Sequence, residues 1–126
     1  MMRDQKLWTW HLAAGAVILV FLGLHMGVMH LEAVLGLPFS PAGGHPIDWG
    51  NVVARAKSAF FAVTYVVLLG AALFHGLYGA RNILFELGPG NTVKKTVNGV
   101  FLVAGLGLFV LGTWAAWATF ALARAS

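Results

Sequence analysis

Four histidines lie within or at the ends of long apolar stretches of this sequence. These are His11, His25, His30 and His75, whereas His45 lies in a segment rich in Pro and Gly, where we expect it to be solvated. Ionisable side chains are costly inside a membrane, and those found there commonly bind ligands or relay protons. A neutral imidazole is also a suitable axial ligand for haem iron. A single such histidine can equally hydrogen-bond a neighbouring helix. We therefore use the depth of each histidine in the membrane, and the helix face on which it lies, to distinguish these roles.

Cysteine is absent from the sequence. Disulfide bonds, iron–sulfur clusters and thiolate-ligated haem are therefore excluded as features of this chain. The sequence also contains no P-loop, GxSxG or dinucleotide-binding fingerprint. We predict no catalytic residue in the chain, and any cofactor must be held by other side chains, of which the histidines are the best candidates.

Three long apolar runs must position these histidines. Of the 126 residues, 60% are hydrophobic and only 10% are charged, so lipid is the expected solvent of this chain. Asp, Glu, Lys and Arg are absent from 7–31, 58–80 and 96–123, and a helix needs about 20 residues to cross the hydrocarbon. The first run is far longer than a signal-peptide core of roughly 7 to 15 residues, so we expect a retained helix.

Turn-forming residues separate the runs. Pro and Gly are concentrated in 36–50, and Gly-Pro-Gly-Asn occupies 88–91. We therefore predict an all-α integral membrane bundle of three transmembrane helices in a single domain. The predicted helices cover about 7–31, 52–87 and 96–123, and the second is expected to begin with an interfacial turn.

The depths of His25 and His75 differ. Helix one is centred near Leu19 and helix two near Leu69, so His25 lies six residues to the outer side and His75 six residues to the inner side. At 1.5 Å per residue, each is about 9 Å from the midplane, on opposite sides. The two histidines are therefore not expected to ligate one iron. Two haems stacked across the membrane would suit them, each completed by a histidine from another subunit.

His11 lies at the inner level, like His75. It precedes His25 by fourteen residues, which returns it to within about 40° of the same face and about 21 Å away along the helix. We consider two roles for it, a second inner ligand or a donor to a quinone carbonyl or haem propionate. His30 is rotated by about 140° from His25 and ranks below it as a ligand.

Residues around His75 and at the start of the first helix complete the predicted inner environment. Gly79 follows His75 by one turn on the same face and would leave room for a porphyrin against the backbone. Arg81 lies at the polar boundary, where it would pair with a propionate or anionic lipid, or act as a snorkelling anchor. Trp8 and Trp10 lie at the same interface and are further candidates for the quinone or propionate environment.

The basic residues indicate an orientation. The sequence pI near 10 reflects eight basic against four acidic residues, and these charges cluster at helix ends, so membrane topology explains them better than nucleic-acid binding. Five basic residues fall on the N-terminal side of the membrane and three on the other, which favours a cytoplasmic N-terminus. The first group is Arg3, Lys6, Arg81, Lys94 and Lys95, and the second is Arg55, Lys57 and Arg124.

Two stretches resemble a known family. His75, Gly79 and Arg81, followed by Glu86, resemble the His-x-x-x-Gly-x-Arg-x-x-x-x-Asp signature of succinate dehydrogenase and fumarate reductase membrane anchors. The stretch from His11 through Gly15 to His25 is similar to the opening helix of the same family. The resemblance covers two of the three helices. Glu86 replaces the usual Asp, and alanines precede the first-helix glycine where a Ser is common.

The resemblance implies a haem b-binding cytochrome b anchor subunit of a succinate:quinone oxidoreductase in the cell (inner, cytoplasmic) membrane. It implies His25 as ligand of an outer haem and His75 as ligand of an inner haem, with one or two haems shared with a second membrane anchor subunit. An iron–sulfur subunit and an FAD flavoprotein subunit would dock on the cytoplasmic face. The chain itself would carry no dicarboxylate site and would pass electrons to or from quinone, linking the tricarboxylic acid cycle to the respiratory chain.

Three alternatives remain open. A purely structural assembly subunit fits the composition but leaves the placement of the histidines unexplained. A haem-free structural anchor would use His25 and His75 only as interhelical hydrogen-bond partners. A small proton-coupled transporter subunit would use the membrane histidines as a relay. Against the transporter, Glu32 and Glu86 both lie near helix ends, so no acidic residue is deep in a predicted span.

Overall fold

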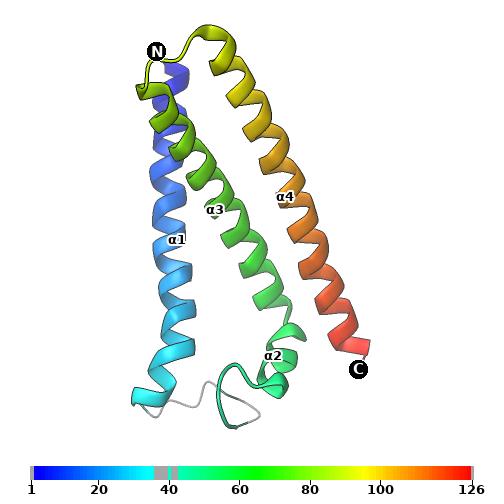
Figure 1. Ribbon diagram of the computed structural model, residues 1–126. Coiled ribbons are helices and arrows are strands. Elements are labelled where there is room, and N and C mark those ends of the chain that lie inside the picture. Colours follow the sequence, from blue (N-terminus) through cyan, green and yellow to red (C-terminus); the bar gives the residue numbers. More distant parts are fainter. Residues whose placement is uncertain (1, 36–39, 41–42, 126) are drawn as a thin grey trace.

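The computed structural model is helical throughout its regular elements (Figure 1). It describes residues 2–35, 40 and 43–125, and within the first helix the side chains of 5–27, 29 and 30. The side chains of Arg3 and Glu32 and most of the predicted external segment before residue 43 lie outside the described residues. The helices are α1 (Met2–Leu35), α2 (Trp49–Ala56), α3 (Ala59–Glu86) and α4 (Asn91–Ala125).

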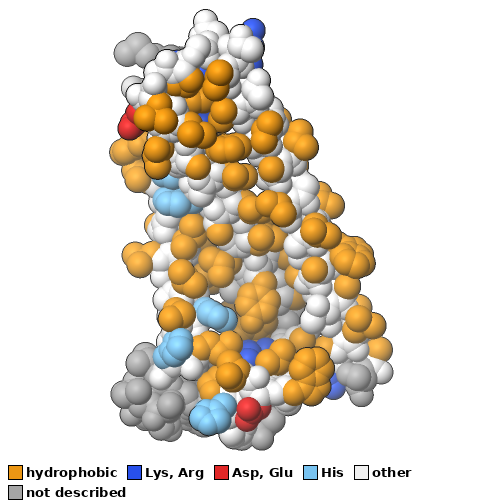
Figure 2. Space-filling model, viewed as in Figure 1, with side chains coloured by type: hydrophobic (Ala, Val, Ile, Leu, Met, Phe, Trp, Pro, Cys, Tyr) orange, Lys and Arg blue, Asp and Glu red, His pale blue; other side chains and the backbone are white. Residues whose placement is uncertain are grey.

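Among the described residues, three helices are long and apolar enough to cross a membrane. The candidate spans are Gln5–Gly27, Ala59–Glu86 and Asn91–Ala125. Hydrophobic side chains are spread over the whole visible face of the molecule, as Figure 2 shows, and of the described residues of the three long helices only Ala62 is a buried hydrophobic residue. An apolar surface of this extent is stable in contact with lipid chains but unfavourable in contact with water. The prediction of an all-α membrane protein with three transmembrane helices is therefore confirmed, and the chain is a multi-pass membrane protein.

The helices extend beyond the uncharged runs. α1 begins at Met2, and α4 begins at Asn91, so that Lys94 and Lys95 belong to its first turns. Lysine stems can lie along an apolar helix while the ammonium group reaches the interface, so a charge near a helix end does not terminate the helix.

The range 52–87, predicted as one element, is divided. The interfacial turn is a separate helix, α2, and the chain resumes as α3 after Lys57 and Ser58. Ser58 has an extended backbone, with φ −94° and ψ 121°, at the N-cap of α3. Serine is favoured at this position, and its extended conformation lets the chain change direction between the two helices. α3 ends at Glu86, where Gly88 has φ 70° and donates a backbone hydrogen bond to Phe85 O at 3.1 Å.

The three long helices form an open array with α3 in the middle. α3 packs against α1 on one side and α4 on the other, and the described residues of α1 and α4 do not pack on each other (Figure 1). The N-terminus and the α3–α4 connection lie at one end, which we call the N-terminal end. α2 and the C-terminus lie at the other, which we call the α2 end. The open array leaves the outer faces of α1 and α4 free for lipid or for other subunits.

The segment before α2 is fixed by side chains of α2. Asn51 is fully buried, and its Nδ2 donates to the backbone oxygens of Gly43 (2.8 Å) and His45 (2.9 Å). One turn later, Arg55 Nη2 donates to the oxygen of Pro46. The described part of this loop is therefore folded against the helix by buried polar bonds.

Candidate functional site

Two histidines from different helices are in direct contact near the N-terminal end. The rings of His11 on α1 and His75 on α3 are stacked, with centroids 4.1 Å apart and an interplanar angle of 5°. The nearby ring of Tyr78 lies 5.2 Å from that of His11 and is tilted by 49°. Both histidines had been predicted at the inner level, and the structure brings their rings together there.

Glycines on the opposite helix make room for each ring. A methyl group at Gly79 would lie 3.3 Å from His11 Cε1, and one at Gly15 would lie 3.1 Å from His75 Cε1. The spacing His-x-x-x-Gly occurs on both helices, and because the helices are antiparallel, each histidine meets the glycine of the other helix. We expected Gly79 to leave room for a porphyrin against the backbone. The His11 ring occupies this place, because it is the nearest side chain of the helix packed opposite.

A hydrogen bond orients the His75 ring. Its Nδ1 lies 3.1 Å from the backbone oxygen of His11, and a carbonyl can only accept, so Nδ1 carries the proton in this bond. In the neutral ring, Nε2 then has a free lone pair in the ring plane, which the stacked His11 does not cover. Histidines that ligate metals usually donate the other ring nitrogen to a backbone carbonyl in this way.

The two histidines differ in their bonding. His11 Nδ1 is buried and has no hydrogen-bond partner among the described residues. The rings are stacked face to face, so their nitrogens do not point at a common iron from opposite sides. Of the two roles considered for His11, the donor role therefore suits this arrangement better than a shared inner iron with His75.

Aromatic and cationic contacts extend the cluster toward α4. The Arg81 guanidinium lies 5.7 Å from the centroid of Tyr78 and 4.3 Å from that of Phe85. Its Nε donates to Asn98 Oδ1 on α4 at 2.6 Å, and Nη1 donates to Asn82 Oδ1 at 2.9 Å. Arg81 is thus held between α3 and α4 rather than extended as a simple snorkelling anchor.

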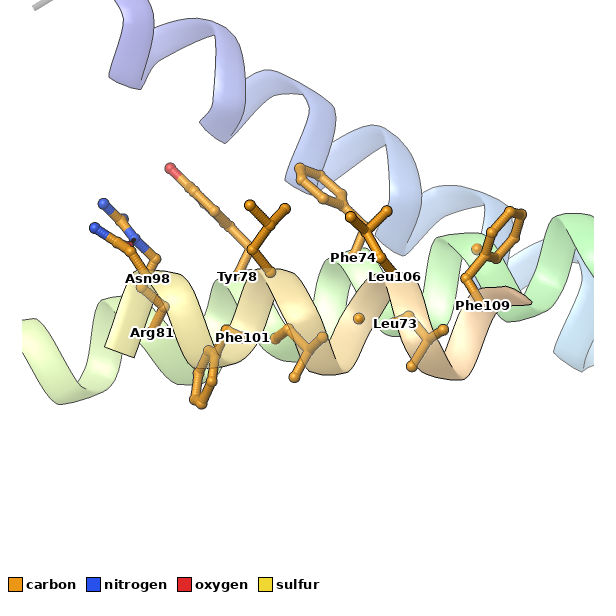
Figure 3. Close-up of a pocket in the computed structure, with 12 residues that line it drawn as sticks. Leu73, Phe74, Tyr78, Arg81, Asn98, Phe101, Leu106 and Phe109 are labelled. Atoms are coloured by element: carbon orange, nitrogen blue, oxygen red, sulfur yellow. Dashed lines mark hydrogen bonds between the residues drawn. The ribbon is translucent and has the colours of Figure 1, made fainter. Parts of the chain in front are cut away.

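A groove of about 420 Å³ runs between α3 and α4 from this arginine (Figure 3). Arg81 and Asn98 lie together at one end, and Phe109 marks the other. The remaining lining is almost entirely apolar. It comprises Gly70, Leu73, Phe74, Leu77, Tyr78, Phe101, Leu102, Gly105 and Leu106. The groove therefore suits an amphiphile with one polar end.

His25 lies apart from this cluster, toward the α2 end. It lines a cavity of about 320 Å³ between α1 and α3, together with aromatic side chains such as Phe21 and Phe60 and the buried Arg55. The structure thus places His25 and His75 at different levels, and it does not bring them together.

The other predicted site residues are more peripheral. Trp10 is exposed and lines a groove of about 480 Å³ beside Phe74, on another face of the α1–α3 pair. Trp8 is exposed and lines none of the cavities described above. His30 and His45 are exposed, and the His45 backbone N–H donates to Asp48 Oδ2 at 2.8 Å.

Three residues of these sites were not singled out from the sequence. Tyr78 and Asn98 connect the histidine pair and Arg81 across three helices, and Arg55 is buried beside the His25 cavity. The duplicated His-x-x-x-Gly spacing was a usable signal for the α1–α3 contact. No comparable signal marks Asn98, because one polar residue near a helix end is common in membrane proteins.

Within the part of the chain that the structure describes, the site at the N-terminal end offers an oriented imidazole with a free Nε2, a buried imidazole nitrogen without a partner, and a cation near the membrane boundary. These groups suit haem ligation or a quinone head group better than nucleophilic catalysis, since among the described side chains no base and nucleophile pair is assembled here. No protein-family model, curated protein or solved structure matches this chain.

Proposed function

We propose that this chain is a haem b-binding membrane anchor subunit of a succinate:quinone oxidoreductase. In this proposal His75 ligates an inner haem and His25 an outer haem, each shared with a second membrane anchor subunit. The haem supplies a one-electron carrier between an iron–sulfur subunit and membrane quinone. The dicarboxylate site and the flavin belong to partner subunits.

The observation that carries the proposal is the hydrogen bond of His75 Nδ1 to the backbone oxygen of His11. This bond fixes the His75 ring and leaves Nε2 as an acceptor. A haem ligand needs this tautomer and a fixed ring orientation. A histidine serving only as an interhelical bridge would show the same hydrogen bond and the same acceptor Nε2, so the geometry supports haem ligation and the spectroscopic test below separates the two roles.

The surroundings of His75 support an anionic or carbonyl-bearing ligand at this level. Arg81 supplies a fixed positive charge six residues further along α3, suited to a propionate. His11 Nδ1 supplies an unused hydrogen-bonding position in a buried setting, suited to a quinone carbonyl or a propionate. Trp10 and Trp8 supply exposed indoles at the same end of the bundle.

The proposal includes an orientation with the N-terminal end toward the cytoplasm. Arg81 near the end of α3, Lys94 and Lys95 in the first turns of α4, and Lys6 of α1 lie at that end and favour the cytoplasmic side. The iron–sulfur and flavin subunits would then dock there. Labelling of a Pro89→Cys variant by a membrane-impermeant thiol reagent in intact cells tests this orientation, because the chain has no other cysteine. Strong labelling from outside would reverse it.

The function itself is tested by optical spectroscopy of the gently solubilised native complex. We expect a b-type reduced-minus-oxidised spectrum, with His75→Ala and His25→Ala each losing a different haem. His30→Ala is the matched control, because His30 is an exposed histidine on the same helix as His25. A complex that lacks haem bands, or a control that loses haem as readily, would leave a haem-free anchor as the better account.

A further inference from the structure

The α2 end holds a basic side chain that the proposed function does not use. Arg55 on α2 is only 7% exposed. Nη2 donates to the backbone oxygen of Pro46, whereas Nη1 is buried and has no hydrogen-bond partner among the described residues. A guanidinium keeps its charge in proteins, and a buried charged donor without a partner is strongly destabilising.

A cavity of about 380 Å³ opens beside Arg55 between α2, α3 and α4, and Met29 of α1 also lines it. Val52 and Ala56 of α2 form part of its wall, and Ala116 of α4 another part. Apart from Arg55 and two hydroxyl-bearing residues, Tyr65 and Thr119, its lining is apolar. One cation in the lining of an otherwise largely apolar cavity is complementary to an anionic head group joined to a hydrocarbon chain.

The position of Arg55 matches the depth of lipid head groups. α2 is a short helix between the loop and α3, at the end of the membrane-spanning part of the bundle (Figure 1). Trp49 on α2 and Ile47 just before it are exposed, as expected for residues at the membrane interface. In Figure 2, basic atoms at this end of the molecule are surrounded by hydrophobic side chains.

We propose that Arg55 binds the phosphate of a membrane phospholipid, with one acyl chain of that lipid in the cavity between α2, α3 and α4. When the side chains that cover Nη1 move aside, Nη1 supplies a charge-assisted hydrogen bond to a phosphate oxygen, which gives the buried guanidinium its missing partner. The acyl chain fills space that the three helices leave open. The lipid thereby connects α2 to α4 at the α2 end of the bundle. The separate cavity that His25 lines, which also contacts Arg55, is not part of this lipid site.

Native mass spectrometry of the full chain, purified in mild detergent with its accompanying subunits, tests this inference. We expect phospholipid adducts on the wild-type protein and about tenfold weaker retention in Arg55→Gln, because one charge-assisted bond is lost. Lys57→Gln is the matched control, since Lys57 is a nearby basic residue whose side chain is exposed. Equal retention by Arg55→Gln and the wild type would overturn the proposal.

A second variant separates the lipid from other anions without touching the charge. Ala116→Leu narrows the α4 wall of the cavity but does not line the cavity that contains His25. We expect it to lose the phospholipid adduct as well, with unchanged helix content by circular dichroism. If Ala116→Leu keeps the adduct, the acyl chain does not lie in this cavity and the proposal fails. If Arg55→Gln loses haem but not lipid, the anion on Arg55 is a haem propionate and the proposal also fails.

Free phosphate is the remaining source of the same chemistry. Washing the protein with inorganic phosphate should leave the phospholipid adduct in place, because the acyl chain also contributes to binding. Displacement of the adduct by inorganic phosphate, or saturable binding of phosphate that matches the lipid in affinity, would show that the cavity has no part in binding and would overturn the proposal.

Discussion

The two interfaces of α3 use glycine in different ways. On the α1 side, Gly15 and Gly79 receive the rings of two histidines that also stack on each other and share a hydrogen bond. On the α4 side, Gly105 receives an aliphatic tip, since a methyl group there would lie 2.9 Å from Leu77 Cδ1. Gly112 contacts the aliphatic tip of Leu69 in the same manner, whereas Gly70 of α3 contacts the ring of Phe109 from α4.

This difference bears on how precisely each interface is specified. Helices in lipid gain no hydrophobic free energy from contact, so close packing and interhelical hydrogen bonds decide their association. An aliphatic tip can rotate to another rotamer when its neighbour changes. The His75 ring cannot do so without giving up its bond to His11 O. The α1–α3 interface therefore tolerates one register, whereas the α3–α4 interface can adjust.

The largest expected effect comes from filling the space at Gly15. Gly15→Leu would place three further carbons beyond a methyl group that already lies 3.1 Å from His75 Cε1, so α1 and α3 must separate. We expect a loss of about 3 kcal/mol in the free energy of unfolding, at the upper part of the usual range for overpacking. Thermal unfolding of the full chain in mild detergent measures it.

Gly23→Leu on the same helix provides the matched control for that variant. A Cβ at Gly23 meets no heavy atom within 4 Å, so its stability should change by no more than about 0.5 kcal/mol. Equal losses in the two variants would mean that α1 is destabilised by leucine in general and that the contact with α3 has no special role.

A smaller effect distinguishes the two histidines from each other. His75→Phe keeps a stackable ring but loses the bond to His11 O, which should cost about 1 kcal/mol. His11→Phe keeps the accepting backbone oxygen and removes the buried, unpartnered Nδ1, so we expect it to be neutral or slightly stabilising.

Comparing the unfolding of these two phenylalanine variants with that of His30→Phe, at an exposed histidine, gives the measurement. Bound haem on His75 would enlarge the difference in the same direction. A larger loss for His11→Phe than for His75→Phe would contradict the assigned hydrogen bond.

The spanning helices were predictable because their signal is local. An uncharged apolar run longer than about 20 residues has few alternatives to a membrane helix, whichever partners it packs against. The level of each histidine followed from the same runs, since helical rise converts sequence separation into depth. His11 and His75 were accordingly placed at one level before their contact was known.

The rotation of each helix about its axis, and the packing of α2 against α3 and α4, could not be predicted in the same way. Which face of α1 meets α3 depends on small residues and side-chain shapes on both helices, and both had glycines on several faces. The sequence marks Arg55 only as a basic residue that indicates topology, because hydropathy contains no information on how α2 packs against α3 and α4 to bury it. The contact between the His11 ring and Gly79 could not be predicted either, because this contact depends on how α1 packs against α3.

The smallest expected effect is at the adjustable interface. Gly105→Ala introduces a methyl group close to Leu77 Cδ1, which is the far end of a flexible side chain and can rotate away. Alanine also favours the helix by up to about 1 kcal/mol over glycine, so the net change should lie within about 0.5 kcal/mol of zero. Gly107→Ala, with no neighbouring atom within 4 Å, is the control on the same helix. The corresponding Gly15→Ala variant meets a ring held by a hydrogen bond and should unfold at a clearly lower temperature than either. If Gly105→Ala is as damaging as Gly15→Ala, then the α3–α4 interface is as rigid as the histidine interface, and the hydrogen bond of His75 is not what sets the register of the bundle.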